Sequence, residues 1–220
     1  DRESRQQYLN AQYRFDRGLT SAQVDLYRND TRYREDPVDT PRHDRTDFDT
    51  TGLAARSSFA LGAHHQLQLG GEIYEDGAEA SRDGAPRPQY PDSERRITGL
   101  YLQDIWSWGP LSLVPGVRWD RYEAASNTGA ARDIDADRTS LKLGVTWALG
   151  GGFSLRASAG EAFRAPNLVE LFPVGQHFLG NEFRPNPDLR PDCARNVELG
   201  IDFRRQGWLR KGDCLQLRAS

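Results

Sequence analysis

The chain alternates hydrophobic and polar side chains along most of its length, which is the period of a β-strand with one apolar face. In residues 6–16 the apolar side chains Leu9, Tyr13 and Phe15 face one way, and polar side chains such as Gln12 and Arg14 face the other. Residues 66–74 and 139–149 repeat the pattern. Segments of this kind predict roughly ten strands, each near the length of about 9–11 residues that a membrane-spanning strand needs.

Two kinds of connection join these predicted strands. Short turns near residues 17, 63, 108 and 151 alternate with long polar loops over 35–49, 75–94 and 123–138 and around residue 178. All long loops then lie at one end of an antiparallel sheet, an asymmetry typical of outer-membrane β-barrels. Aromatic residues near the strand ends suit the girdles of such a barrel, namely Trp106, Trp108, Trp119 and Tyr122. The prediction is an all-β fold, an antiparallel transmembrane β-barrel.

Composition excludes several other classes of protein. With 29 basic and 32 acidic residues and a net charge of −3, the chain has no basic footprint for nucleic acid. Mean hydropathy is −0.75 and no apolar run is long enough for a transmembrane helix. There is no Gly-x-Ser-x-Gly, Cys-x-x-Cys or phosphate-cradling glycine loop, so we do not expect an enzyme. The chain starts at Asp1 without a leader, and we expect a mature piece or a fragment.

Residues 160–193 form the segment around which the rest is organised. It contains two proline tetrads, Phe163-Arg164-Ala165-Pro166 and Asn186-Pro187-Asp188-Leu189, with His177 as the one imidazole between them. Proline has a fixed φ and no N–H donor, so neither tetrad fits inside a central strand. The interval between them shows no clean period and predicts a long ordered loop.

This segment resembles the extracellular-loop signature of TonB-dependent outer-membrane receptors. The tetrads that flank a histidine are similar to those of the haem and haemoglobin receptor branch, with Asp188 where the commoner motif has Asn. The resemblance implies that His177 is an axial ligand of haem iron, a role that neutral imidazole commonly takes. We also consider Arg164 and Arg184 as partners of the haem propionates. The tetrads themselves are expected to fix where the loop leaves and re-enters the barrel.

The resemblance also implies the rest of the assembly. Residues 1–220 would be a partial barrel domain of a transporter that closes at about 22 strands around a plug. The plug domain is expected to lie outside this chain, to supply the second haem ligand and to connect the receptor to the TonB complex. The expected location is the outer membrane of a Gram-negative cell, in contact with its lipid. A piece with two open strand edges is not expected to fold alone in lipid.

Several alternatives remain at the level of sequence. The same fold could carry a ferric siderophore or another metal chelate, with His177 incidental. A porin or adhesin-like barrel that does not transport actively and a soluble β-sandwich are further candidates. Within the haem branch, free haem, haemoglobin and a haemophore are not distinguished.

The remaining histidines and the cysteines are expected to play no part in ligand binding. His64 and His65 lie in a predicted short turn, where adjacent side chains of a strand point oppositely and do not form a chelating pair. His43 is expected to be a solvated loop residue, with a weak metal site as the alternative. Cys193 and Cys214 would lie near opposite ends of one strand, beyond disulfide reach, so we expect two free thiols.

Overall fold

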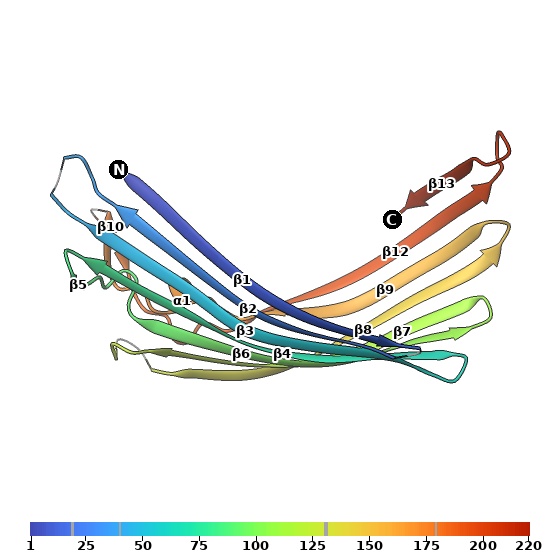
Figure 1. Cartoon of the computed structure of the whole chain (residues 1–220), viewed down its shortest axis with the longest axis horizontal. Coiled ribbons are helices and arrows are strands. Elements are labelled where there is room, and N and C mark those ends of the chain that lie inside the picture. The colour runs from blue at the N-terminus through green and yellow to red at the C-terminus, as the bar shows by residue number, and fades with distance from the viewer. Residues whose placement is uncertain (19, 40, 130–131, 179) are drawn as a thin grey trace.

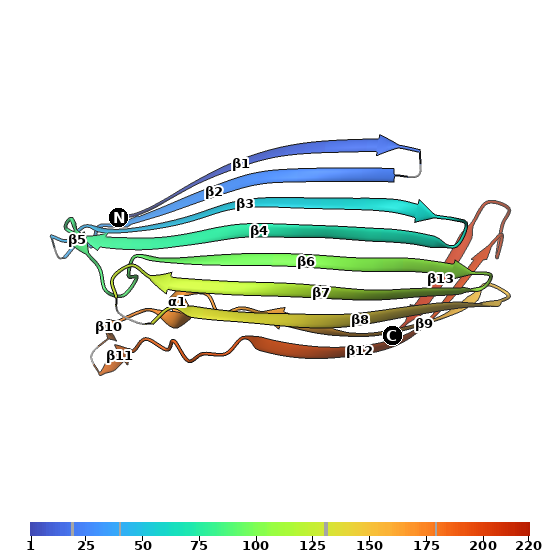
Figure 2. The same cartoon turned by 90° about the horizontal axis from the view of Figure 1, so that it is seen from below.

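A computed structural model describes residues 1–18, 20–39, 41–129, 132–178 and 180–220. Long antiparallel strands follow one another in sequence order and form a single curved sheet (Figures 1 and 2). Its strands are β1 (Arg2–Arg17), β2 (Thr20–Glu35), β3 (Asp44–Leu61), β4 (His65–Arg82), β6 (Ser93–Trp108), β7 (Leu111–Ser126), β8 (Ile134–Gly150), β9 (Phe153–Arg164), β12 (Asp192–Gln206) and β13 (Cys214–Ala219). The predicted all-β, antiparallel architecture is confirmed.

Four small elements lie outside this succession. The short strand β5 (Ala85–Pro86) pairs with the end of β4. The single-turn helix α1 (Leu168–Leu171) and the hairpin of β10 (Gly175–Phe178) and β11 (Asn181–Phe183) follow β9. Among the described residues, no helix is long and apolar enough to cross a membrane.

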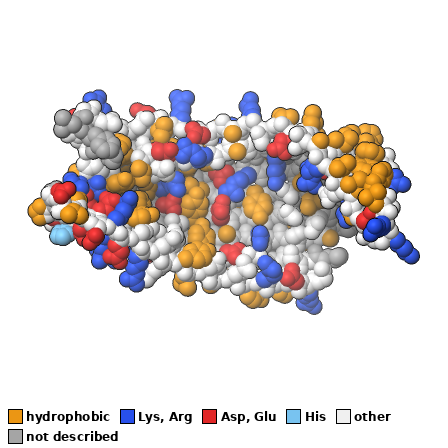
Figure 3. Space-filling model, turned by 90° about the horizontal axis from the view of Figure 1, so that it is seen from above, with side chains coloured by type: hydrophobic (Ala, Val, Ile, Leu, Met, Phe, Trp, Pro, Cys, Tyr) orange, Lys and Arg blue, Asp and Glu red, His pale blue; other side chains and the backbone are white. Residues whose placement is uncertain are grey.

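The register of the sheet separates its side chains into two faces. Cross-strand partners share a face, and the pairs Leu26↔Leu53 and Leu69↔Leu102 place large apolar side chains together on what we call the outer face. The other side, the inner face, carries polar partners such as Gln12↔Asp25. Figure 3 looks onto the hollow side of the sheet, where acidic and basic side chains are interspersed with hydrophobic ones. The predicted division into an apolar and a polar face is therefore present along the sheet.

The strands are longer than the sequence predicted, and the polar loops are correspondingly shorter. The loop expected over 35–49 ends where β3 begins at Asp44, and the loop expected over 75–94 includes the last part of β4. These extensions are charged on both faces, which is why they had no strand period. Cross-strand ion pairs such as Arg32–Asp47 at 2.6 Å and Arg96–Glu75 at 2.8 Å accompany the pairing there.

Buried hydrophobic residues gather at one end of the sheet, under α1. Ala78, Ile97, Tyr122 and Ala124 belong to the inner face of β4, β6 and β7, and residues from the segment after β9 cover them. A single curved sheet has no second layer to bury its inner face, so this covering segment creates the core. The buried residues of the covering segment thus lie at and just after the first proline tetrad, between Ala165 and Pro173, whereas Asn186 and Asp188 of the second tetrad are exposed.

The two cysteines are separated as expected. Cys193 pairs with Phe163 at one end of β12, and Cys214 pairs with Gln206 at the other end. A strand rises about 3.3 Å per residue, which puts the thiols roughly 40 Å apart. Both are free and exposed, and the prediction of two unpaired thiols is confirmed.

Candidate ligand-binding site

The first proline tetrad ends β9 and starts α1. Pro166 lies just beyond the strand, and Asn167 takes an extended conformation that caps the helix. The Asn167 side chain accepts a hydrogen bond from the Glu170 N–H at 2.9 Å, and Glu170 Oε2 accepts one from the Asn167 N–H at 2.8 Å. This reciprocal capping box satisfies backbone donors that one helical turn leaves open. The loop therefore begins with a defined turn, which the sequence analysis did not predict as helix.

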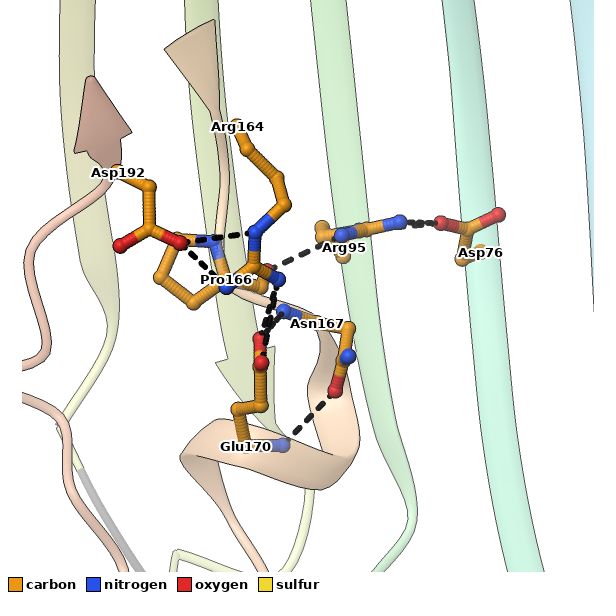
Figure 4. Close-up of polar contacts among 7 residues, drawn as sticks. All are labelled: Asp76, Arg95, Arg164, Pro166, Asn167, Glu170 and Asp192. Atoms are coloured by element: carbon orange, nitrogen blue, oxygen red, sulfur yellow. Dashed lines mark hydrogen bonds and ion pairs between the residues drawn. The ribbon is translucent and has the colours of Figure 1, made fainter. Parts of the chain in front are cut away.

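Arg164 joins the two ends of the loop. Its guanidinium donates to Glu170 at 3.0 and 3.1 Å and to Asp192, at the start of β12, at 2.6 and 2.9 Å (Figure 4). The hydrogen bonds from Arg164, followed by the one from the Asn167 N–H, lower the pKa of Glu170 below its ordinary value. In the described structure Arg164 is engaged in closing the loop, although its side chain is 56% exposed.

Apolar side chains anchor the loop to the inner face. Leu168, Leu171 and Phe172 are buried in the cluster around Ile97 and Tyr122. The second tetrad joins this anchor, because the Asn186 N–H donates to the carbonyl of Leu171 at 2.8 Å. Leu189 packs against the same cluster. Both tetrads thus make packing and turn contacts.

Arg95 is a site residue that the sequence analysis missed. It lies on the inner face of β6, opposite Asp76 of β4, to which its Nε donates at 3.0 Å. Its Nη1 donates to the carbonyl of Pro166 at 3.0 Å (Figure 4). The side chains of Arg95 and Asp76 are only 15% and 19% exposed. Asp76 fell in the segment predicted as loop and Arg95 lay just beyond the end of that segment, and recognising the strand extension would have placed them opposite each other.

The histidine between the tetrads lies in the hairpin that follows this anchor. β10 contains His177, and Gln176 of the same strand pairs with Glu182 of β11. The side chain of His177 lies outside the described part of the structure, and its role as an axial ligand stays a prediction. The side chain of Phe178 likewise lies outside the described part of the structure, whereas Phe183 is described and lies in β11. Arg184 follows β11 with its side chain 86% exposed, 3.6 Å from Glu182.

The remaining tetrad residues complete the picture of the loop. Ala165 and Pro166 are buried, and Phe163 packs against the core cluster. Leu189 N–H donates to the Asn186 carbonyl at 3.2 Å, which forms a turn around Pro187. Asp188 pairs with Arg132, which lies between β7 and β8. These contacts hold the backbone that carries the hairpin.

The other histidines make separate contacts. His43 Nδ1 is 2.8 Å from Asp36 Oδ1, a hydrogen bond that raises the pKa of the imidazole. His64 Nδ1 is 2.9 Å from the Ser107 carbonyl, whereas His65 Nδ1 is 2.6 Å from Asp104. The adjacent imidazoles thus bind different partners. No group of three or more His, Cys, Asp or Glu side chains in the described ranges could hold a metal ion.

Comparison of the sequence with known proteins identifies the family to which the chain is similar. A family described as TonB dependent receptor-like, beta-barrel, matches residues 1–217. The chain is 30% identical to the Heme/hemopexin utilization protein C of Haemophilus influenzae over 93% of its length, and 30% identical to the Hemin receptor of Yersinia pestis over 72%. It covers 30% and 24% of these relatives, respectively, so it spans less than a third of their length.

A solved structure agrees with the fold. A double mutant of the Serratia marcescens hemophore receptor HasR, solved with its hemophore HasA and heme, superimposes with a TM-score of 0.85. The match covers 99% of this chain and 39% of that receptor, at 22% sequence identity. The family match extends over nearly the whole chain, and the strand order, the two-faced sheet and the anchored loop are consistent with it. The chain therefore belongs to the family of TonB-dependent receptors, in the β-barrel that lies in the outer membrane.

Proposed function

We propose that this chain forms part of the barrel of an outer-membrane receptor that takes up haem by TonB-dependent transport, with His177 as an axial ligand of the haem iron. Membership of the family makes the chain part of a receptor and not of an enzyme. Support for the cargo comes from the names of two relatives at 30% identity, a heme/hemopexin utilization protein and a hemin receptor.

The observation that carries the proposal is the anchored loop. Arg164 closes its two ends, Arg95 holds its first turn, and the buried side chains around Phe172 fix it to the inner face. The hairpin with His177 starts directly after this anchor. A ligand to iron must be held in place before the cargo arrives, because ordering a loop upon binding reduces the affinity. The arrangement therefore suits a histidine whose position matters.

In the proposed mechanism each part has a separate task. Neutral imidazole of His177 binds the iron of haem that arrives on the outer side, either free or from a haem-carrying protein. A plug domain supplies the second axial ligand, and the TonB complex supplies the energy by acting on that plug. The alternative is a receptor of the same fold for a ferric siderophore, in which His177 does not bind the iron.

A haem titration of the receptor in detergent separates these two functions. The wild-type protein is expected to shift the Soret band of haem on binding, and His177→Ala is expected to weaken binding and to alter the bound spectrum. His43→Ala is the matched control, because His43 is an exposed imidazole between β2 and β3, where it pairs with Asp36. Equal affinity and unchanged spectra in His177→Ala contradict the haem-ligand assignment and favour the siderophore receptor.

A further inference from the structure

Three arginines converge on one buried carboxylate beside the anchored loop. Asp44, at the start of β3, has a side chain that is only 1% exposed. Arg82 binds it in a bidentate manner at 2.7 and 3.0 Å. Arg42 Nε lies 3.2 Å and Arg87 Nη1 lies 3.5 Å from its Oδ2. One negative charge therefore faces three guanidinium groups.

The hydrogen bonds of this cluster are incomplete. Among the described residues, the buried Nε atoms of Arg42 and Arg87 form no well-aligned hydrogen bond, and that of Arg42 has only its ion-pair contact with Asp44. Asp83, a further carboxylate nearby, accepts a hydrogen bond from the backbone N–H of His43 at 2.8 Å. Buried cations are costly unless they are paired and hydrogen-bonded. Three guanidinium groups face the carboxylates of Asp44 and Asp83, and this excess of positive charge points to an additional oxyanion as a further partner.

The cluster lies on the inner face of the sheet and not on the outer face, which carries the large apolar side chains. Asp44 and Arg82 are cross-strand partners of β3 and β4, and so are Phe48 and Ala78, four residues further along each strand. Side chains four positions apart on a strand share a face, and Ala78 belongs to the core of the inner face. Aromatic rings continue from the cluster, since the Arg87 guanidinium lies over the Tyr90 ring at 5.6 Å and Tyr90 meets Phe48 edge-on at 6.2 Å. A flat aromatic ligand that carries an anionic group matches both parts of this surface.

The same turn also contacts the strand of His177. Residues 87–90 form a turn in which the Tyr90 N–H donates to the Arg87 carbonyl at 3.1 Å. From this turn, the Pro88 carbonyl accepts a hydrogen bond from the Val174 N–H at 3.0 Å, and the Gln89 side chain donates to the Gln176 carbonyl at 3.5 Å. The backbone next to His177 and the arginine cluster are therefore connected through four consecutive residues.

We propose that Arg42, Arg82 and Arg87 form a binding site for a carboxylate of the incoming ligand, and that this ligand is a planar aromatic dicarboxylate of the porphyrin type. The identification of the ligand as a porphyrin rests on the proposed function. The carboxylate binds the accessible parts of the Arg42 and Arg87 guanidinium groups, whose side chains are 38% and 14% exposed, while Asp44 keeps Arg82 in place. Charge-assisted hydrogen bonds of this kind are strong, and guanidinium groups suit carboxylates geometrically.

Iron-free protoporphyrin IX tests the site without involving the histidine ligand. Fluorescence titration of the receptor compares this diacid with its dimethyl ester, which has the same ring and no charge. The wild-type protein is expected to bind the diacid about ten- to a hundredfold more tightly than the ester, because only the diacid can form charge-assisted hydrogen bonds with the arginines. Arg87→Gln is expected to lose most of that preference and to leave binding of the ester unchanged.

Control variants keep the result interpretable. Arg96→Gln removes an arginine of the outer face that pairs with Glu75, and it is expected to bind both porphyrins like the wild-type protein. Arg42→Gln tests the cluster independently if Arg87→Gln does not fold. In the wild-type protein, added salt is expected to weaken binding of the diacid more than that of the ester.

The remaining outcomes overturn the inference in distinguishable ways. Equal binding of diacid and ester by the wild-type protein, or an unchanged preference in both arginine variants, removes the carboxylate site. If haem still gives a Soret shift that depends on His177 in that case, the proposed function stands without the carboxylate site. If the wild-type protein binds neither haem nor protoporphyrin, the proposed function and the carboxylate site both fall.

Discussion

The anchoring of the loop by Arg95 can be tested with Arg95→Gln. The substitution removes the bond from Nη1 to the Pro166 carbonyl, 3.0 Å long, and the ion pair with Asp76. Thr50 Oγ1 still donates to Asp76 at 2.8 Å, so the carboxylate keeps one partner. A hydrogen bond to a charged group contributes about 1.5–3 kcal/mol. We expect the docked loop to lose about 2–3 kcal/mol relative to an opened loop, because the bond to the Pro166 carbonyl exists only in the docked state, whereas the pair with Asp76 joins two strands in both states.

Amide hydrogen exchange measures this loss where it occurs. The N–H groups of Glu170 and Asn186 donate hydrogen bonds within the docked loop, at 2.9 and 2.8 Å, and we expect opening of the loop to expose them to exchange. Their exchange is expected to accelerate by roughly 30- to 150-fold, the equivalent of 2–3 kcal/mol. Amides in the middle of β6 and β7 are expected to exchange as in the wild-type protein.

The adjacent arginine provides a matched control for this experiment. Arg96 is on the opposite face of β6, and its pair with Glu75 is about half exposed. Arg96→Gln is expected to change exchange in the loop by less than about fivefold, since exposed pairs contribute about 0–1 kcal/mol. Unchanged protection of the loop in Arg95→Gln, or the same acceleration in both variants, refutes the anchoring role of Arg95.

Two further predictions concern the loop at low pH and the barrel wall. The hydrogen bonds from Arg164 lower the pKa of Glu170, so its carboxylate stabilises the loop fully above the unfolded pKa of about 4.3. This contribution is lost as the pH falls through the lower, folded pKa. Limited proteolysis of the loop is therefore expected to distinguish the wild-type protein from Glu170→Gln at pH 7, and to stop distinguishing them below the folded pKa. A difference that persists at pH 2 contradicts this. Gly70→Val is expected to destabilise the barrel by about 1–3 kcal/mol, because an added Cβ would lie 2.7 Å from the Tyr101 ring and from a backbone oxygen. In Gly144→Ala the Cβ meets its nearest atom at 3.5 Å, so thermal unfolding of that variant is expected to match the wild-type protein, and equal unfolding temperatures for both variants count against the packing argument.

The sequence predicted the sheet well because its signal is local. Alternation at period two places Leu26 and Leu69 on one face whatever the neighbouring strands are, and the register confirms it. Where both faces are charged, as from Glu75 to Arg82, the period disappears although the strand continues. The long-range pairs that stabilise these extensions, such as Arg96 with Glu75, are not visible in a single segment.

The candidate site, too, could be predicted from the sequence only in part. The proline tetrads could be recognised in the sequence, because proline restricts the backbone wherever it stands. The turn of helix at Leu168 has a local signal, the capping box of Asn167 and Glu170, which the sequence analysis missed. The role of Arg95 depends on a contact between residues that lie far apart in the chain. Tyr122 was assigned to an aromatic girdle, but it is fully buried under the loop, since β7 extends beyond the predicted strand end and its inner face is covered there. That assignment is wrong for this residue.

Resonance Raman spectroscopy of the haem-loaded receptor tests the central claim, iron ligation by His177, most directly. The wild-type protein is expected to give the marker bands of haem with an axial imidazole, and His177→Ala is expected to lose them and to regain them when free imidazole is added. Imidazole bands that stay the same in His177→Ala contradict the account, because the iron would then be ligated by another histidine.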